Sequence, residues 1–281
     1  MRIGHNMSAI FANRMMQNVS NRLDKSIEKL ASGEEINRAG DDASGLAVSE
    51  KMRTQIRGLI QAEKNAQNGL SFIQVAEGSF QQLSDILQRM RSLSIQSANG
   101  IYSNDDRLQI QVEVSQLIEE IDRIATSAQF NKLKMLTGEF ARSSRRGSMF
   151  FHIGPNSNQR IRVYIATVSA RAFNLIAENG RKRSISTVGQ ANSMIGYVDI
   201  ALDKLNRQRA DLGAYYNRME NTIRALTQSY ENMLAADSRI RDADMAATMV
   251  EFTKDRILMQ TGVAMLAQAN FKPQLALKLI Q

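Results

Sequence analysis

The 281-residue chain contains no cysteine, no tryptophan, only two prolines and 6% aromatic residues. The absence of cysteine excludes disulfides, thiol nucleophiles and thiolate metal sites, although it does not indicate a compartment. A shortage of aromatics and prolines is typical of thin helical bundles, whose narrow seams are filled by Leu, Ile, Met and Ala. No run of about 18 apolar residues could cross a bilayer, and the N-terminus lacks the apolar segment of a cleavable secretory signal. We therefore expect a soluble, uncleaved, mainly helical protein with no membrane span.

A heptad repeat between Ile195 and Met233 is the strongest local pattern. Its steps of three and four residues predict one long helix, about 57 Å over this stretch, that packs along other helices. A single polar residue, Arg209, interrupts it. The repeat consists of Ile195, Val198, Leu202, Leu205, Arg209, Leu212, Tyr216, Met219, Ile223, Leu226, Tyr230 and Met233.

Two further seams predict helices in the first half of the chain. A third helix is expected from about Asn104 to Gln129, because Ser103 can cap a first turn that contains two acidic residues. The long seam before it consists of Met52, Ile56, Leu59, Glu63, Ala66, Leu70, Ile73 and Phe80, and continues through Leu83, Leu87, Met90 and Leu93. The seam of the third helix consists of Leu108, Val112, Ser115, Ile118, Ile121 and Ala125.

Both chain ends also predict amphipathic helices, each with an exposed apolar stripe. Such helices are marginal when isolated in water, and a monomer cannot cover both stripes. Head-to-tail stacking of many copies would bury them and would propagate a filament. The residues expected at these subunit contacts are Val19, Leu23, Ile27, Leu30, Met249, Phe252, Met259, Val263 and Leu266.

Positive charge is concentrated in residues 130–190, which hold eleven Lys and Arg against two Asp and Glu in a chain of net charge +8. This stretch lacks helical periodicity. Residues 149–153 and 160–166 predict a β-hairpin with Ile161, Val163 and Ile165 on one face. The charge is interpreted either as a solvated surface or as a partner-binding patch. The candidate basic surface consists of Arg145, Arg146, Arg160, Arg162, Arg181, Lys182 and Arg183.

No constellation of catalytic or ligating residues is present in the sequence. The pair Asp41 and Asp42 precedes an apolar run and is interpreted as a helix start, since adjacent side chains on a helix diverge. His5 and His152 are the only histidines, and neither a His-Glu-x-x-His motif nor a P-loop occurs. We therefore expect no catalytic residues, no cofactor and no metal.

Two motifs at opposite ends of the chain resemble the signatures of bacterial flagellins. The N-terminal motif lies in residues 26–33 (SIEKLASG) and 36–47 (INRAGDDASGLA), and the C-terminal motif in 238–246 (SRIRDADMA) and 264–270 (AMLAQAN). The short middle, with residues 150–156 (FFHIGPN) and 215–220 (YYNRME), is similar to class B core flagellins of spirochaetes, which build periplasmic filaments.

Periodicity and resemblance together predict a mainly α fold: an elongated antiparallel coiled-coil rod with a small β-hairpin, and terminal helices that form a coiled-coil core. The resemblance implies three parts. Residues 1–42 and 237–281 are expected to form the inner filament core, 43–140 and 190–236 an outer helical rod, and 141–189 a basic segment in place of variable domains.

The resemblance also implies a function and partners. It implies a structural subunit that self-assembles with sister flagellins into a motility filament of the bacterial flagellum, either periplasmic or secreted and extracellular. Export unfolded through a type III apparatus, a chaperone at residues 252–271, sheath proteins, and cap and hook-junction proteins are expected on the same basis. Arg89, Leu93 and Glu113 match a stretch recognised by the Toll-like receptor for flagellin, and subunit contacts are an equally open role for them.

Two alternatives to a filament subunit stay open at this point. A hook–filament junction protein shares the terminal helices but stops at a few copies. A basic coiled-coil nucleic-acid binder would use residues 130–190, with Phe150, Phe151 and Tyr164 stacking on bases. Long fibres formed from pure protein would favour the filament, whereas salt-sensitive binding by the monomer would favour the nucleic-acid binder.

Overall fold

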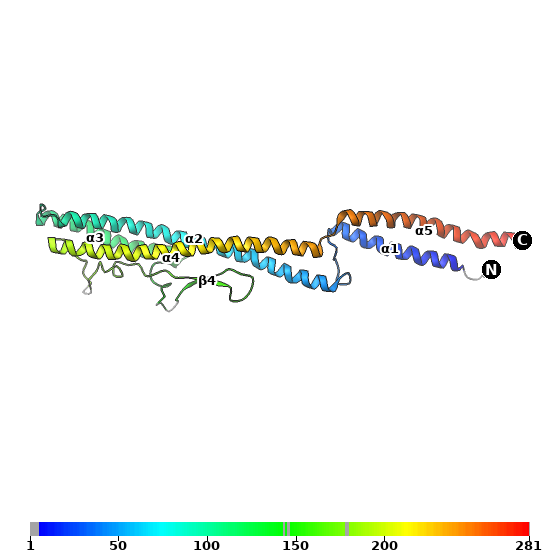
Figure 1. Ribbon diagram of the computed structural model, residues 1–281, viewed down its shortest axis with the longest axis horizontal. Coiled ribbons are helices and arrows are strands. Elements are labelled where there is room, and N and C mark those ends of the chain that lie inside the picture. The colour runs from blue at the N-terminus through cyan, green and yellow to red at the C-terminus, as the bar shows by residue number, and fades with distance from the viewer. Residues whose placement is uncertain (1–5, 143, 145–146, 178–179, 281) are drawn as a thin grey trace. The chain divides into compact units, whose positions relative to one another are not determined.

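The computed structural model describes residues 6–142, 144, 147–177 and 180–280, with side chains described in the last helix as far as Phe271. His5, Arg145 and Arg146 lie outside the described residues. The helices are α1 (Met7–Ser32), α2 (Ala43–Ala98), α3 (Asn104–Ser127), α4 (Val188–Arg241) and α5 (Met245–Ile280) (Figure 1). The strands are β1 (Gln129–Phe130), β2 (Leu133–Lys134), β3 (Met149–His152) and β4 (Arg160–Val163). The expected mainly α fold with a small hairpin is confirmed.

The chain divides into two compact units. One unit contains Met1–Ile56 and Glu231–Gln281, and the other contains Arg57–Tyr230. The long helices α2 and α4 contribute to both. The first unit thus includes residues 43–56 and 231–236 besides the terminal helices.

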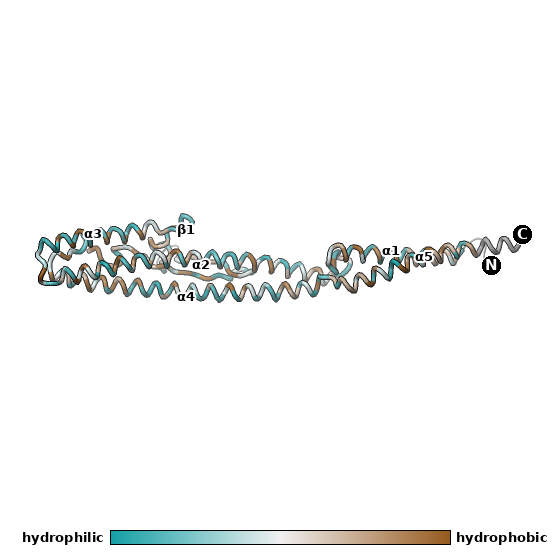
Figure 2. The backbone as a smooth tube through the Cα atoms, turned by 90° about the horizontal axis from the view of Figure 1, so that it is seen from above, coloured by the Kyte–Doolittle hydropathy of each residue, from teal (hydrophilic) through white to brown (hydrophobic). Residues whose placement is uncertain are grey.

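The second unit is built on a bundle in which α3 and α4 both run antiparallel to α2 (Figures 1 and 2). The α4 heptads bury Val198, Leu205, Leu212 and Met219, as their spacing predicts. At the polar step of the repeat, the Arg209 guanidinium lies 2.8 Å from a Glu77 carboxylate oxygen on α2. The one interruption of the α4 seam is therefore an ion pair between two helices.

The seam of α3 differs from the prediction in its first half. Leu108 and Val112 were expected inside, yet they are 53% and 59% exposed, whereas Arg107 is buried. The Arg107 guanidinium donates hydrogen bonds to the carbonyl oxygens of Ser97 (2.8 Å) and Asn99 (3.0 Å), where α2 ends. The Ser97 carbonyl in the last turn of α2 and the Asn99 carbonyl just after it have no partner within the helix, so satisfying them turns Arg107 inward and the apolar pair outward. The second half of the seam is buried as predicted at Ile118, Ile121 and Ala125.

The basic, non-helical segment forms part of the same core. β3 and β4 pair antiparallel, with Phe151 opposite Ile161, close to the predicted hairpin. Ile161, Val163 and Ile165 are all buried, which confirms their common face. The short pair β1 and β2 was not predicted, because two-residue strands are too short to show an alternating pattern. Further buried residues of the segment are Met135, Leu136, Phe140, Val168, Phe173, Leu175 and Ile185.

A glycine allows the hairpin to approach α2 closely. A Cβ atom at Gly58 would lie 2.8 Å from the Cβ of Pro155, in the turn that follows β3. Nearby, the Asn65 side-chain amide donates a hydrogen bond of 3.1 Å to the His152 carbonyl. The hairpin is therefore attached to α2 by both packing and hydrogen bonding.

Replacing Phe72 tests whether this core holds the second unit together. Phe72 is fully buried, and its ring lies edge-on to Phe130 and Phe140 at centroid distances of 5.7 and 6.1 Å. We expect Phe72→Ala to lower the free energy of unfolding by about 3–5 kcal/mol, because the vacated space cannot fully collapse. Urea unfolding followed by circular dichroism measures the loss. Val75→Ala, at a position 42% exposed on the same helix, should cost less than about 1 kcal/mol, and equal losses would contradict the assignment.

Candidate self-assembly surface

The terminal helices α1 and α5 pack side by side in antiparallel orientation (Figures 1 and 2). The Asn6 side-chain amide donates to the Ala269 carbonyl at 2.9 Å. The Arg22 guanidinium pairs with the Asp255 carboxylate at 3.0 Å. Because one residue number falls as the other rises, the two helices run in opposite directions along their whole contact.

The nine residues predicted for the subunit contacts separate into two groups. Ile27, Met249 and Val263 are 46%, 50% and 55% exposed. The other six are half-buried in the structure of this single chain: Val19, Leu23, Leu30, Phe252, Met259 and Leu266. The six half-buried residues lie on the sides of α1 and α5 that face each other, and the three exposed residues lie on the outer sides.

Most of the uncovered apolar surface lies outside the stripes that the residue spacing predicts. The additional residues, each 40–69% exposed, are Met7, Ile10, Phe11, Met15, Val250, Ile257, Leu258, Met265 and Phe271; Met245, at the start of the apolar stripe predicted for the C-terminal helix, is 47% exposed. The sequence did contain a signal, since α5 is apolar around most of its circumference rather than on one stripe. A helix of that kind needs neighbours on more than one side.

A cavity of ≈ 510 Å³ opens on this surface. It lies between the start of α1 and the later part of α5, and its apolar lining includes Met7, Phe11 and Met265. Uncovered apolar residues and an apolar hollow on one helix pair indicate a surface for association.

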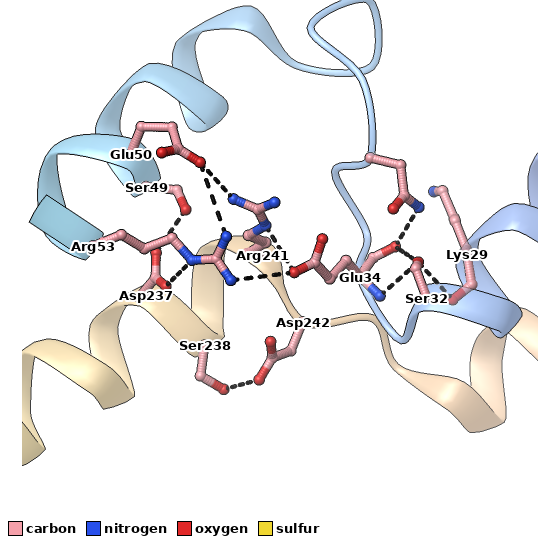
Figure 3. Close-up of polar contacts among 11 residues, drawn as sticks. Lys29, Ser32, Glu34, Ser49, Glu50, Arg53, Asp237, Ser238, Arg241 and Asp242 are labelled. Carbon is pink, nitrogen blue, oxygen red and sulfur yellow. Dashed lines mark hydrogen bonds and ion pairs between the residues drawn. The ribbon is translucent and has the colours of Figure 1, made fainter. Parts of the chain in front are cut away.

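A polar cluster connects the start of α2 with the end of α4 inside the first unit (Figure 3). The Arg241 guanidinium lies 3.0 Å from carboxylate oxygens of both Glu34 and Glu50. Arg53 approaches Glu34 at 3.5 Å and Asp237 at 3.7 Å. Burial opposes the charge on Arg241, but its bonds to Glu50 and Glu34 hold its pKa above the ordinary value.

Buried hydrogen bonds extend this cluster. The Ser49 hydroxyl donates to the Asp237 carboxylate at 2.7 Å, and both residues are buried. The loop after α1 is held to the end of α4 by main-chain bonds from Glu35 N–H to Arg241 O (2.6 Å) and from Ala243 N–H to Gly33 O (2.9 Å). Of these residues, only Gly33, Arg241 and Ala243 belong to the flagellin-like motifs quoted from the sequence, and the sequence predicted none of the contacts of the cluster.

The acidic pair Asp41 and Asp42 lies at the start of α2, as the sequence predicted. The Asp42 carboxylate accepts the N–H groups of Gly45 at 2.9 Å and Ser44 at 3.0 Å, and the Gly45 bond is the main cause of its lowered pKa. The pKa of Asp41 is lowered mainly by the Arg38 N–H. Because these pKa values fall on folding, the stabilisation is present above the unfolded pKa and is lost as pH falls through the folded pKa.

The receptor-like residues do not lie on one surface. Arg89 and Glu113 form an exposed ion pair of 2.8 Å between α2 and α3. Leu93 is 3% exposed and belongs to the bundle core. Only the ion pair is therefore presented to a partner by the folded chain.

The basic candidates differ in what they contact. Arg160 and Arg162 are exposed on β4, with Arg160 over the Phe150 ring at 5.4 Å, and Arg181 is also exposed. Lys182 pairs with Glu119 and donates to the Ser115 carbonyl.

Arg183 likewise has partners within the second unit. Its guanidinium donates to the Asn174 carbonyl at 2.6 Å and lies over the Tyr197 ring at 3.6 Å. Lys182 and Arg183 thus attach their loop to α3 and α4, which the charge count could not reveal.

Other kinds of site are not seen in the described part of the chain. Across its described residues, no three His, Cys, Asp or Glu side chains are grouped to hold a metal ion. Among the same residues, no helix is long and apolar enough to cross a membrane.

A helical chain whose paired ends leave apolar faces uncovered belongs to the class of self-associating structural proteins. Comparison with protein families gives a match to the bacterial flagellin N-terminal helical region over residues 3–141 and to the C-terminal helical region over 195–280. The chain is 57% identical to the flagellar filament 31.3 kDa core protein of Treponema maltophilum, with 99% of each chain covered. It is also 57% identical to flagellin FlaB1 of Treponema pallidum over 99% of each. The chain therefore belongs to the bacterial flagellin family.

The fold is also similar to a solved structure. A flagellar hook-associated protein from Vibrio parahaemolyticus matches 72% of this chain and 100% of its own with a TM-score of 0.58. At 12% identity this match concerns the fold only.

Removing Arg241 tests the polar cluster of the first unit. Its side chain is 13% exposed and faces two carboxylates, so Arg241→Ala leaves them without this partner. We expect the free energy of unfolding to fall by about 1–3 kcal/mol. This is less than the loss on breaking a fully buried ion pair, because Glu50 is exposed. Thermal unfolding of the full chain measures it. The matched control, Arg207→Ala, breaks one exposed pair with Asp203 and should cost less than about 0.5 kcal/mol. Equal losses would assign the cluster no special role.

Proposed function

We propose that this chain is the structural subunit of a flagellar filament and that it polymerises through the outward faces of α1 and α5. One observation carries the proposal: both helices keep large apolar side chains exposed after they have packed on each other. The names of the relatives, flagellar filament core protein and flagellin, support it.

Repetition explains how weak surfaces would give a stable polymer. Each exposed Leu, Ile, Val or Phe that becomes buried contributes about 1.5–3 kcal/mol in transfer terms, before the entropic cost of association. A contact that joins the outward face of one pair to a different face of the next does not close on itself, so it continues as a fibre. Sister flagellins with the same terminal helices could enter the same fibre.

The alternatives receive less support. A hook–filament junction protein shares this fold, but the high identity over the full chain is to filament proteins. A nucleic-acid binder needs free cations and rings along the basic segment. Here Lys182 and Arg183 have partners within the chain, and Phe151 lies 5.7 Å from Phe72 in the core.

The proposed location and export route are based on membership of the flagellin family. The similarity to Treponema proteins supports a periplasmic filament, the site proposed from sequence. Export would use the flagellar type III apparatus in an unfolded state. The exposed apolar residues of α5 between residues 252 and 271 suit a chaperone that covers them before assembly. Cap and hook-junction proteins would meet the same terminal faces at the two ends of the fibre.

The exposed Arg89–Glu113 pair is proposed as a surface for subunit contacts or for a receptor that recognises free subunits. Leu93 would support it from within the core, by holding α2 in place, rather than by contact.

Substitutions on the outward face of α5 test polymerisation. Ile257 and Val263 are each 55% exposed. Changing both to Gln should leave a helical monomer and remove filaments, since the substitutions delete apolar contacts that form only between copies. Electron microscopy and sedimentation after salt-induced polymerisation measure this. Gln260→Asn, an exposed polar change on the same helix, should still give filaments. Normal filaments from the double variant would contradict the proposed surface.

We also propose that the exposed arginines of β4 bind acidic sheath proteins, and charge changes on this strand test it. Each exposed ion pair is worth only about 0.2–1 kcal/mol, but repetition along a filament makes binding multivalent. Arg160→Gln with Arg162→Gln should leave filaments intact and reduce retention of an acidic sheath protein in co-sedimentation. Wild-type retention should fall steeply with salt, because the Debye length shortens from about 10 Å at 0.1 M to 3 Å at 1 M. If the wild type and the double variant retain the sheath protein equally at every salt concentration, this surface is only solvated.

A further inference from the structure

The methionines of this chain are divided between two environments. The chain has 15 methionines and no cysteine, so thioethers are its only sulfur groups. In the described residues, those that are strongly exposed lie only on α1 and α5: Met7 (64%), Met15 (50%), Met245 (47%), Met249 (50%) and Met265 (65%). In contrast, Met90, Met135, Met194 and Met219 in the second unit are at most 1% exposed.

An exposed thioether reacts with hydroperoxides. A sulfur lone pair attacks the terminal peroxide oxygen, the O–O bond breaks, and the oxygen remains on sulfur while water or an alcohol leaves. Sulfur is oxidised by two electrons and the peroxide is reduced by two. The product, methionine sulfoxide, replaces a flexible apolar side chain by a polar one, and sulfoxide reductases can reverse the change. In a chain without thiols, no faster-reacting sulfur competes for the oxidant.

We propose that Met7, Met15, Met245, Met249 and Met265 form an oxidation-sensitive site that controls assembly, with hydroperoxides as the modifying reagent. The inference rests on the proposed function, because it places these residues on the polymerising faces. Met7 and Met265 line the apolar cavity between the two helices, so two of the five would also make that hollow polar when oxidised.

Burial then makes the effect depend on the state of assembly. Moving a polar sulfoxide into an apolar contact without a hydrogen-bond partner costs free energy. We expect this cost to raise the critical concentration for assembly about tenfold for each oxidised methionine at the contact. Subunits already in a filament have these faces covered, so they are protected. Oxidant therefore acts on the free subunit and lengthening stops, while existing filaments persist.

The test uses the purified full-length protein and hydrogen peroxide as the oxidant. Free subunits are oxidised, the peroxide is removed, and oxidation at each methionine is quantified by peptide mass spectrometry. The five exposed sites should oxidise first and the four buried ones last. Polymerisation, followed by sedimentation, should show a critical concentration raised at least about tenfold, with helicity by circular dichroism unchanged. Methionine sulfoxide reductase should restore assembly.

A variant with all five residues changed to Leu is the matched control. Leu and Met have similar volume and polarity, so this variant keeps the apolar faces but lacks the reactive sulfurs. The critical concentration of this variant, whatever its value before treatment, should be the same after peroxide. If the oxidised Leu variant loses assembly as the wild type does, sulfurs elsewhere are responsible and the inference is overturned. A loss of helicity that accompanies the inhibition would overturn it as well.

The proposed function can fail separately from this inference. Untreated wild-type protein that forms no filaments would refute the filament subunit itself. Untreated protein that polymerises, together with oxidised protein that polymerises at the same concentration, would leave the function standing and refute the oxidation-sensitive site.

Discussion

Two helices packed against each other can bury only one face of each, and this limit governs the terminal helices α1 and α5. α1 and α5 carry apolar residues on more faces than one. Their inner residues, such as Leu23 and Phe252, are half-buried between them, whereas Phe11 and Ile257 remain exposed. No third element of the described chain covers these outer faces, so other copies of the chain are their natural partners.

The second unit satisfies its own apolar surface because it has more layers. There α3 and the hairpin segment cover α2 and α4, and Phe72, Ile118 and Ile161 are at most 1% exposed. The basic segment therefore belongs to the fold of this unit, and only some of its cations, among them Arg162, are left on the surface. Within one chain, the second unit therefore buries its apolar surface by folding, whereas the α1–α5 pair leaves apolar surface for assembly.

The polar cluster around Arg241 serves a different purpose from either apolar region. Charges held within 3.0–3.7 Å require one arrangement of the loop after α1, the start of α2 and the end of α4. Main-chain bonds between Glu35 and Arg241 act in the same place. An apolar contact would allow sliding, whereas directed ion pairs and hydrogen bonds fix the position from which α5 begins. The outward faces are thereby presented in a defined orientation within the first unit.

The sequence by itself determined which residues form helices, because heptad spacing and the Ser103 cap are local properties of the chain. It also determined the β3–β4 hairpin and its buried face. Only the tertiary structure decided that Leu108 and Val112 are exposed, that Arg107 turns inward, and that Lys182 and Arg183 have internal partners. Periodicity specifies which side chains share a face, but the neighbour that covers the face comes from a distant part of the chain. The exposure of Leu108 and Val112 and the pairing of the cations depend on that neighbour, so they could not be predicted from local pattern.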